Sequence, residues 1–326
     1  MTALSLNIAV LALALLTDAA VGYPERLYKA IGHPVVWIGK LIAVFDRLLN
    51  RPEWRKPIRR GMGVLAIAVV IAAAAAPAWM LSVWLRQLPG GWLVEALLAS
   101  SLITQRSLHD FVAAVGRGLD REGLAGGRRA VAHIVGRNPQ KLDEAGVSRA
   151  AIESLAENFS DGIVAPAIWL VIGGLPGIAA YKAINTADSM IGHRTEKHTE
   201  FGWAAARLDD LVNLPASRLA GLWIALATAL RDCRRARLAL RAMRRDAPLH
   251  RSPNAGWPEA AMASALGLRL GGPRIYGEVQ VEDHWMGRGR SRATAADIWR
   301  ALGLYRGACA AQIAVVAVAA ILLALS

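Results

Sequence analysis

Long apolar segments constrain the fold of this chain more than any other feature. About 18 to 20 consecutive apolar residues are enough to cross the hydrocarbon core of a bilayer as a helix. Because no water is available there, the backbone must satisfy its own hydrogen bonds, which favours helices. The sequence therefore predicts an all-α, polytopic membrane protein with about four to six membrane segments, some of them broken or re-entrant, joined by large cytoplasmic helical connections. The candidate segments are residues 4–21, 61–85, 92–115, 163–180, 211–230 and 308–325.

The first apolar segment and the two central ones lead to different predictions of membrane topology. Residues 4–21 lack the basic start and the small-residue cleavage site of a signal peptide, so they predict a membrane helix. Residues 163–180 contain two prolines and three glycines, which are typical of broken or re-entrant helices. If 163–180 and 211–230 both span the bilayer, the polar loop between them faces outward. We favour re-entry, because it keeps every polar group on the cytoplasmic side.

Positive charge is concentrated between the apolar segments. Lys and Arg exceed Asp and Glu by 13. The excess follows the positive-inside rule and predicts cytoplasmic connections in a bacterial inner membrane. Within the first connection, near-helical spacing of apolar residues between positions 35 and 49 predicts an interfacial helix. The basic residues form no stripe interleaved with aromatic residues, so we expect no nucleic-acid partner. The predicted connections are residues 22–60, 105–162 and 231–307.

Carboxylate and amide side chains recur in the central stretch, residues 151–213. Glu153, Glu157 and Asp161 fall at i, i+4 and i+8, so a helix would place them on one face. Their charges repel one another, and a divalent cation would relieve that repulsion. Mg²⁺ prefers one or two carboxylates together with waters and substrate phosphates. A solvated helix face is the alternative explanation for this spacing. The other members of the set are Asn158, Asn185, Asp188, Asp209, Asp210 and Asn213.

Four long motifs point to one family. They read DAAVGYPERLYKAIGHPVVWIGKLI, ESLAENFSDGIVAP, YKAINTADSMIGHRTEKHTEFGWAAARLDDLVNLPASRL and SPNAGWPEAAMASALGLRLGGPRIYG. In sequence and order they resemble the cobalamin-biosynthesis family called CobD or CbiB, the adenosylcobinamide-phosphate synthases. The resemblance extends from about residue 18 to residue 287, which favours a single integral membrane domain over residues 1–326.

The resemblance implies a reaction that forms an amide bond. The free propionate carboxylate of adenosylcobyric acid would be joined to (R)-1-amino-2-propanol or its O-phosphate, giving adenosylcobinamide or its phosphate. Because a carboxylate is a poor electrophile, we expect activation by ATP, with Mg²⁺ as the usual companion of phosphoryl transfer. The expected partners are the two substrates, the lipid bilayer and other membrane enzymes of late cobalamin biosynthesis.

Site residues follow from the polar set and from the resemblance. The expected catalytic groups, a subset of which would bind Mg²⁺, are Glu153, Glu157, Asp161, Asp188, Asp209 and Asp210. We expect the first three on one helix face, the last three on a facing one, and one carboxylate to deprotonate the attacking ammonium. Arg194 and Arg207 offer forks suited to phosphate or carboxylate. The other expected substrate ligands are Asn158, Asn185, Asn213 and, by resemblance, His33, Asn254, Trp257 and Glu259.

Two other functions fit the same residues. An Mg²⁺-dependent membrane transferase could hold an isoprenoid diphosphate between the Asn185/Asp188 pair and the Asp209/Asp210/Asn213 group. Alternatively, a corrinoid transporter or a non-catalytic scaffold would use intramembrane charges along a permeation path. Dependence on corrinoid and ATP, compared with prenyl diphosphate, separates the first alternative from the ligase. Turnover by the purified protein excludes a purely passive role.

Overall fold

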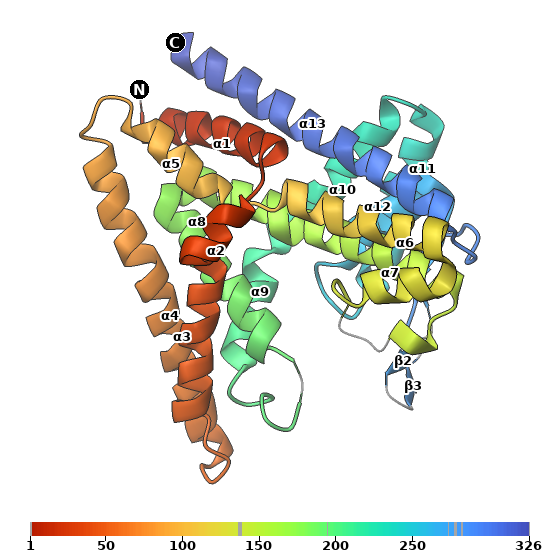
Figure 1. Cartoon of the computed structure of the whole chain (residues 1–326), viewed down its shortest axis with the longest axis horizontal. Helices are drawn as coiled ribbons and strands as arrows, with labels where there is room; N and C mark the ends of the chain where they lie inside the picture. Colours follow the sequence, from red (N-terminus) through yellow and green to blue (C-terminus); the bar gives the residue numbers. More distant parts are fainter. Residues whose placement is uncertain are drawn as a thin grey trace. The chain divides into compact units, whose positions relative to one another are not determined.

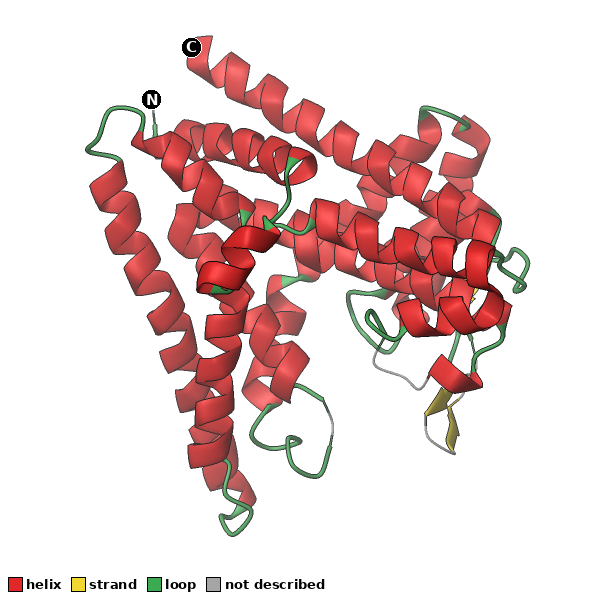
Figure 2. Ribbon diagram, viewed as in Figure 1, coloured by secondary structure: helices red, strands yellow, loops and turns green. Residues whose placement is uncertain are grey.

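The computed structural model describes residues 2–135, 139–193, 195–272, 274–276, 279–281 and 283–325. Most of this part is helical (Figure 2). The strands in it form two short antiparallel pairs: β1 (Leu270–Gly271) with β4 (Trp285–Met286), and β2 (Arg274–Tyr276) with β3 (Val279–Val281). The predicted all-α class is confirmed.

The chain divides into two compact units that interleave along the sequence. The first comprises residues 1–104, 165–213 and 316–326, and the second comprises 105–164 and 214–315. The helices of the first unit (Figure 1) are α1 (Ala3–Ala20), α2 (Glu25–Ile31), α3 (Pro34–Leu49), α4 (Lys56–Leu85), α5 (Gly91–Ser100), α8 (Ala165–Ile191) and α9 (Trp203–Val212).

The second unit holds the remaining elements. Its helices are α6 (Gln105–Val131), the 3₁₀ turn η1 (Pro139–Lys141), α7 (Glu144–Phe159), the π-helical turn η2 (Ser160–Val164), α10 (Leu214–Ala229), α11 (Cys233–Asp246), the 3₁₀ turn η3 (Ala247–Leu249) and α12 (Gly256–Leu266). The last helix, α13 (Ala295–Leu325), belongs to this unit up to residue 315. The described strands lie between α12 and α13 in the sequence.

Local sequence explains where several helices begin and end. The Thr2 hydroxyl accepts a hydrogen bond from the Ser5 backbone N–H at the start of α1. Asp143 caps α7 in the same way, through the Gly146 N–H at 2.7 Å. Asp232 caps α11 by accepting from two backbone N–H groups. Such caps satisfy donors that a helix start leaves without intrahelical partners. Gly267 ends α12 with φ +70°, a left-handed conformation that favours glycine.

Five helices of the described part are long and apolar enough to cross a membrane, or six if one bent pair counts as a span. This confirms the prediction of four to six segments. The five are residues 3–20, 25–49, 56–85, 144–191 and 295–325. The bent pair is α9 with α10, whose axes differ by 45°. Its bend is the geometry of a broken or re-entrant segment.

One predicted boundary needs correction, and one predicted connection contains a stretch of spanning length. The segment 92–115 is not one helix, because α5 ends at Ser100 and α6 begins at Gln105. Ten residues of α5 extend about 15 Å, half the thickness of the hydrocarbon core. The stretch 25–49, expected to carry an interfacial helix within a connection, has the length and composition of a span. Its side chains are largely exposed, so an apolar surface is available to lipid.

The core of the first unit lies among α3, α4, α8 and α9. Ile42, Val70, Ala183 and Phe201 are buried there, and Figure 1 shows α3 and α4 side by side. A Cβ atom at Gly63 of α4 would lie 1.9 Å from the Phe201 carbonyl oxygen. Only glycine therefore permits α4 to approach the segment that precedes α9 so closely.

The core of the second unit joins the ends of distant segments. Phe159, the last residue of α7, meets Tyr305 of α13 edge to face, with ring centroids 5.6 Å apart. The Tyr305 hydroxyl donates a 2.8 Å hydrogen bond to the Gln105 carbonyl. The buried Tyr305 thus has an aromatic contact for its ring and a hydrogen-bond partner for its hydroxyl.

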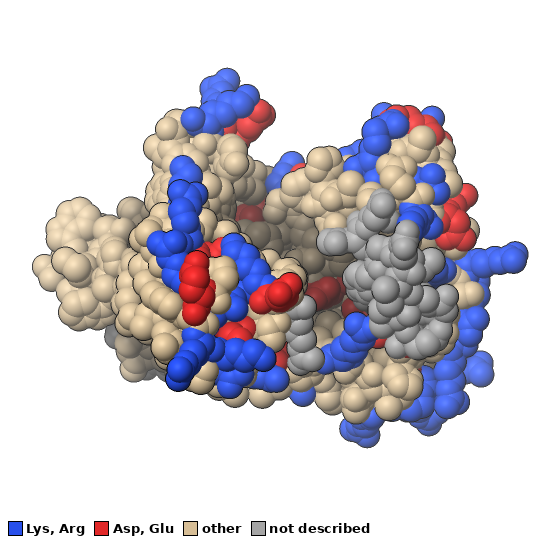
Figure 3. All heavy atoms as spheres, turned by 90° about the horizontal axis from the view of Figure 1, so that it is seen from below, with Lys and Arg blue, Asp and Glu red and all other residues tan. Residues whose placement is uncertain are grey.

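Positively charged side chains are spread over the face that Figure 3 shows. Lys and Arg are scattered among uncharged residues there, with fewer Asp and Glu. The excess of blue over red atoms in that view agrees with the net charge of +13. Such a field raises the local concentration of anions.

A buried ionic network connects α1, α4 and α5 within the first unit. Glu95 is fully buried, and its two oxygens accept from Arg86 Nε and Nη2 at 2.9 and 3.0 Å. The Ser82 hydroxyl donates to Glu95 at 2.7 Å. Arg86 also donates to Asn7 Oδ1 at 2.7 Å, and Asn7 Nδ2 donates to the Val171 carbonyl of α8. The network stabilises the buried charge of Glu95, which would be very unfavourable without these partners.

The kink of α8 lies beside this network. Gly174 has φ +61° and interrupts the helix two residues before Pro176. The Val171 carbonyl, at the interruption, accepts the hydrogen bond from Asn7 at 3.1 Å. Side chains of neighbouring helices commonly satisfy backbone groups that a break exposes in the membrane.

Replacing Arg86 by Met should lower the free energy of unfolding by about 3 kcal/mol, because Glu95 would stay buried without its cation. Equilibrium unfolding in mixed detergent micelles measures the change. Combining Arg86→Met with Glu95→Leu should recover much of the loss, since no buried charge then remains. A double variant as unstable as the single one would contradict this account.

Candidate functional site

Polar side chains of α8 and α9 meet inside the first unit. We call this group the α8–α9 cluster; it consists of Tyr181, Lys182, Asn185, Asp188, Asp209, Asp210 and Asn213. On α8 the members recur at three- to four-residue intervals, so they share one face of the helix. On α9, Asp209 and Asn213 are four residues apart, with Asn213 at the C-cap. The two faces are directed toward each other, as the hydrogen bonds between them show.

Direct hydrogen bonds connect the two helices. Asn185 Nδ2 donates to Asp209 Oδ1 at 3.2 Å. The Tyr181 hydroxyl donates to Asn213 Oδ1 at 2.9 Å. On α8 itself, Lys182 Nζ lies 3.5 Å from Asn185 Oδ1. These contacts fix the carboxylate of Asp209 relative to α8, which is a requirement for precise chemistry.

The α8–α9 cluster combines burial with several charges. Lys182 is 6% exposed, Asp209 9% and Asn213 1%. The negative charges of Asp188 and Asp210 both act on the Asp209 carboxylate. Three neighbouring carboxylates and one buried ammonium on largely apolar helices are costly, which makes the α8–α9 cluster the candidate functional site.

His33 belongs to the same neighbourhood. The charge of Lys182 acts on its imidazole. His33 is also the N-cap of α3, where its Nδ1 accepts from the Val35 N–H at 3.2 Å. Its ring packs against that of Tyr23, with centroids 4.5 Å apart. The capping role alone is a sufficient reason for a histidine here, and the proximity to Lys182 makes a substrate contact compatible with it.

The structure describes one of the two arginines that are predicted to bind phosphate or carboxylate. Arg207 of α9 lies 3.4 Å from Asp210, on the same helix, and its side chain is 57% exposed. It can therefore turn toward an anion at little cost. Arg194 lies outside the described residues.

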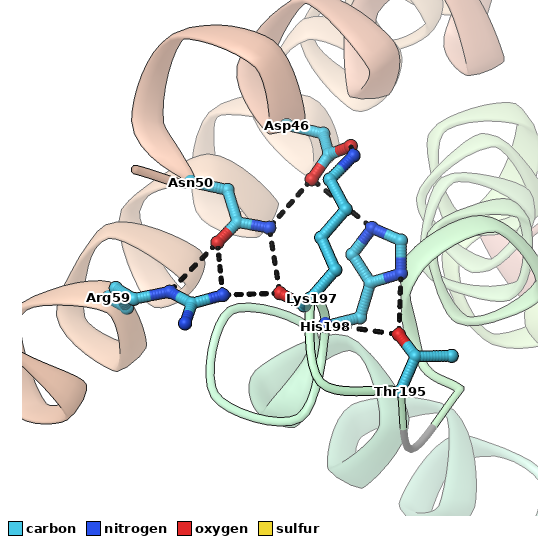
Figure 4. Close-up of polar contacts among 6 residues, drawn as sticks. All are labelled: Asp46, Asn50, Arg59, Thr195, Lys197 and His198. Atoms are coloured by element: carbon cyan, nitrogen blue, oxygen red, sulfur yellow. Dashed lines mark hydrogen bonds and ion pairs between the residues drawn. The ribbon is translucent and has the colours of Figure 1, made fainter. Parts of the chain in front are cut away.

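The connection between α8 and α9 is fastened to α3 and α4 by side chains of the first unit. We call the fastened stretch, residues 195–200, the 195–200 segment (Figure 4). Asp46 pairs with the Lys197 ammonium, and its other oxygen lies 3.3 Å from His198 Nε2. Asn50 donates to the Lys197 carbonyl at 3.0 Å, and Arg59 donates to the same oxygen. This carbonyl is thus held by two side chains, which fixes the backbone as well as the side chains of the segment.

Replacing Asp46 by Ala should loosen the 195–200 segment and speed trypsin cleavage after Lys197 several-fold, because local opening exposes the backbone to the protease. Limited proteolysis followed by peptide mass spectrometry measures the rate. Glu25→Ala is the matched control, since it also removes a carboxylate that pairs with a lysine, Lys29. Equal cleavage rates in the two variants would refute a fastening role for Asp46.

The carboxylates of the second unit only partly match the expected common face. Glu153 is 5% exposed and accepts from the Gly271 backbone N–H at 2.8 Å. Glu157 is exposed, one α-helical turn further along. Asp161 lies in the π-helical turn η2, beyond the end of α7. The regular α-helical spacing therefore ends before Asp161, because a π turn changes the number of residues per turn.

The remaining predicted ligands of the second unit have packing partners. Asn158 donates to the Ser154 carbonyl of its own helix at 2.9 Å. Asn254 is buried, and its Oδ1 accepts from Ser217 and Arg218 at 3.2 Å each. The Arg218 guanidinium lies 4.6 Å from the centre of the Trp257 ring, a cation–π geometry.

Glu259 is the most buried carboxylate among the predicted ligands. It is 2% exposed, and its Oε1 lies 3.8 Å from His250 Nε2. A carboxylate beside an imidazole in a buried place can orient that imidazole. Asn254, Trp257 and Glu259 all come from the start of α12 and the loop before it.

Four residues of these groups were not among the predicted site residues: Tyr181, Lys182, Arg218 and His250. A signal for Lys182 was present, because a lysine three residues before Asn185 on an apolar helix is rare unless it has a function. Arg218 carried the same signal in α10. His250 has no comparable signal, since it lies in a polar loop.

Several side chains of these groups carry oxygen atoms of the kind that bind Mg²⁺. Among the residues that the structure describes, no group of three or more His, Cys, Asp or Glu side chains has the geometry to hold a metal ion. Mg²⁺ needs only one or two carboxylates when substrate phosphates complete its shell. Asp188, Asp209 and Asp210, with Asn185, supply hard oxygen donors of that kind, so the α8–α9 cluster fits a phosphate-dependent Mg²⁺ site.

Comparison with known proteins gives a consistent result. A family model described as "CobD/Cbib protein" matches residues 11–305. The cobalamin biosynthesis protein CobD of Rhodobacter capsulatus is 50% identical over 321 residues, which cover 98% of this chain and 99% of that protein. The protein of the same name from Rhizobium meliloti is 50% identical over 315 residues, covering 96% of each chain. That from Brucella melitensis is 50% identical over 305 residues, covering 93% of each. No solved structure matches the chain.

Proposed function

The chain belongs to the CobD/Cbib family, and we propose that within cobalamin biosynthesis it forms an amide bond. The substrates are adenosylcobyric acid and (R)-1-amino-2-propanol or its O-phosphate, and the product is adenosylcobinamide or its phosphate. The observation that carries the proposal is the family match over nearly the whole chain. It includes every residue of the α8–α9 cluster.

The chemistry requires activation of the carboxylate. ATP transfers its γ-phosphoryl group to a propionate oxygen, which gives an acyl phosphate and ADP. The ammonium first loses one proton to a base, and the free amine nitrogen then attacks the carbonyl carbon. The C–N bond forms, the C–O bond to the phosphate breaks, and the second proton from nitrogen is lost as inorganic phosphate leaves. Positioning and charge neutralisation supply most of the rate enhancement in phosphoryl transfer.

The α8–α9 cluster can supply these functions. Asp188 and Asp210 are the proposed Mg²⁺ ligands, and the ion would neutralise charge on the transferred phosphate. Lys182 and Arg207 are the proposed partners of phosphate oxygens. Asp209 is the best-placed proton acceptor, because Asn185 holds its carboxylate in a buried position.

The membrane setting is part of the proposal. The helices of spanning length make this a multi-pass membrane protein. We propose that it lies in the bacterial inner membrane with its basic connections on the cytoplasmic side, where ATP is available. The overall charge of +13 would favour anionic substrates.

Purified protein in detergent, supplied with adenosylcobyric acid, aminopropanol phosphate, ATP and Mg²⁺, should form the amide product that mass spectrometry detects. Omitting ATP should abolish the product, because the carboxylate then stays unactivated. Chelation with EDTA should also abolish it, and added Mg²⁺ should restore it. Product without ATP would refute the acyl phosphate route, and turnover of an isoprenoid diphosphate instead would favour the transferase alternative.

Asp209→Asn should lower kcat at least about a hundredfold, because the side chain keeps its shape but loses its charge and its capacity to accept a proton. Initial rates at saturating substrate measure the change. Asp110→Asn is the matched control, since this carboxylate is 60% exposed and outside the cluster. An Asp209→Asn variant that is folded and as active as the control would remove Asp209 from the proposed machinery.

A further inference from the structure

A cavity lined by arginines lies within the second unit. It has a volume of about 670 Å³ and is formed by residues at the ends of α10 and α12, the start of α11 and the first turns of α13. Among the described residues, Arg231, Arg235 and Arg300 line it, together with Trp299 and one carboxylate, Asp232. The lining therefore carries an excess of positive charge, and neither the predicted site nor the proposed reaction uses it.

The three guanidinium groups are held in place by backbone carbonyls. Arg235 Nη1 donates to the Ala265 carbonyl at 3.2 Å, and Arg300 Nη2 donates to the Leu266 carbonyl at 3.0 Å. Both carbonyls belong to the last turn of α12, whose dipole attracts cations. Because a guanidinium has five N–H donors, one such bond orients the group without exhausting its capacity.

Arg231 is positioned by the backbone of α13. Its Nη2 donates to the Gly303 carbonyl at 3.1 Å. Cβ atoms at Gly303 and Gly307 would lie 3.7 and 4.0 Å from its guanidinium nitrogens, which is ordinary van der Waals contact. The guanidinium therefore lies against this face of α13, in the lining of the cavity. Rigid, pre-oriented forks match the geometry of phosphate oxygens.

The carboxylates near these arginines do not cancel the positive charge. Asp232 lies 3.5 Å from Arg235 and also caps α11. Asp297 lies 2.9 Å from Arg300 and 2.6 Å from Arg290, so it is shared between two cations. The side chains of Arg235 and Arg300 remain 46% and 45% exposed. A dianionic or monoanionic group could therefore approach both.

The sequence places this cavity at a membrane boundary. Gly303 lies about one helical turn before the apolar run 308–325 of α13. Arg231 follows directly after α10, the apolar part of the bent pair. Trp299, in the cavity wall, is the residue type enriched at the level of lipid headgroups. Two apolar segments thus end at the same cavity.

The helix that begins at the cavity has the character of a membrane-surface helix. On α11, exposed arginines alternate with the exposed leucines Leu238 (45%) and Leu240 (38%). A basic helix that also exposes apolar side chains binds anionic membrane surfaces. This second observation favours a ligand that comes from the lipid phase.

We propose that Arg231, Arg235 and Arg300 form a binding site for the phosphate of an anionic phospholipid headgroup. Basic pockets next to membrane helices bind such headgroups through charge-assisted hydrogen bonds. Soluble phosphates share the chemistry, and the experiment below separates the two sources. The inference does not rest on the proposed reaction, because it concerns binding without substrates.

The test titrates the purified full chain, in neutral detergent, with phosphatidylglycerol, phosphatidylcholine, inorganic phosphate and ATP. Native mass spectrometry counts the bound molecules. Phosphatidylglycerol should bind in preference to phosphatidylcholine. Arg231→Gln and Arg235→Gln should each weaken its first binding step about tenfold, the loss of one charge-assisted hydrogen bond.

Two further variants make the result decisive. Arg237→Gln removes the same charge from an exposed position of α11 and should leave the first binding step unchanged. Asp232→Asn should tighten phosphatidylglycerol binding, because it removes a carboxylate of the cavity while asparagine still caps the helix. A gain of affinity cannot result from unfolding.

Three outcomes would overturn the proposal. An equal loss in Arg237→Gln would mean that diffuse surface charge, not the cavity, binds the lipid. Unchanged binding in folded Arg231→Gln and Arg235→Gln would exclude these side chains. Arginine-dependent binding of inorganic phosphate or ATP, without arginine-dependent binding of phosphatidylglycerol, would assign the site to a soluble ligand.

Discussion

The absence of water in the bilayer is the constraint on which this structure depends, because every polar group placed there must find its partner in the protein. The ion pair between Arg86 and Glu95 is the clearest case, since it buries a full negative charge within the first unit. Asn7 extends the pairing from Arg86 to the Val171 carbonyl at the kink of α8. One set of side chains thus compensates both a buried carboxylate and a broken helix.

The same constraint applies to α8, whose two halves differ in the polar groups that they carry. Its first half is apolar and kinked at Gly174, and the freed backbone is satisfied from α1. Its second half carries Lys182, Asn185 and Asp188, which face carboxylates of α9. The structural network uses a paired arginine and glutamate, whereas the described part of the α8–α9 cluster gathers three carboxylates around a buried ammonium, with Arg207 beside Asp210. Clusters of charged groups that act on one another in this way are candidates for a functional site.

Much of this could be predicted from local sequence, and the exceptions have physical causes. Apolar length alone identified α1, α4 and α13, and helical spacing brought Asn185 and Asp209 into one candidate site. The segment 92–115 was extended too far, because hydropathy does not register the break after Ser100. The partnership of Arg86 with Asn7 joins residues 79 positions apart, which no local pattern encodes. The π turn that holds Asp161 was not predicted, because such a turn, unlike an α-helix, leaves no periodic signature in the sequence.

The fastening of the 195–200 segment has an entropic consequence for the α8–α9 cluster. Residues 192–202 join α8 to α9, and Lys197 lies near the middle of that connection. Because Asn50 and Arg59 hold its carbonyl, the chain is fixed at this point, and a fixed point within a connection reduces the number of conformations that the connection can adopt. The freedom of α9 to drift from α8 is reduced before any ligand arrives, so less ordering remains to oppose binding. A loop that carries none of the cluster's side chains thereby contributes to its preorganisation.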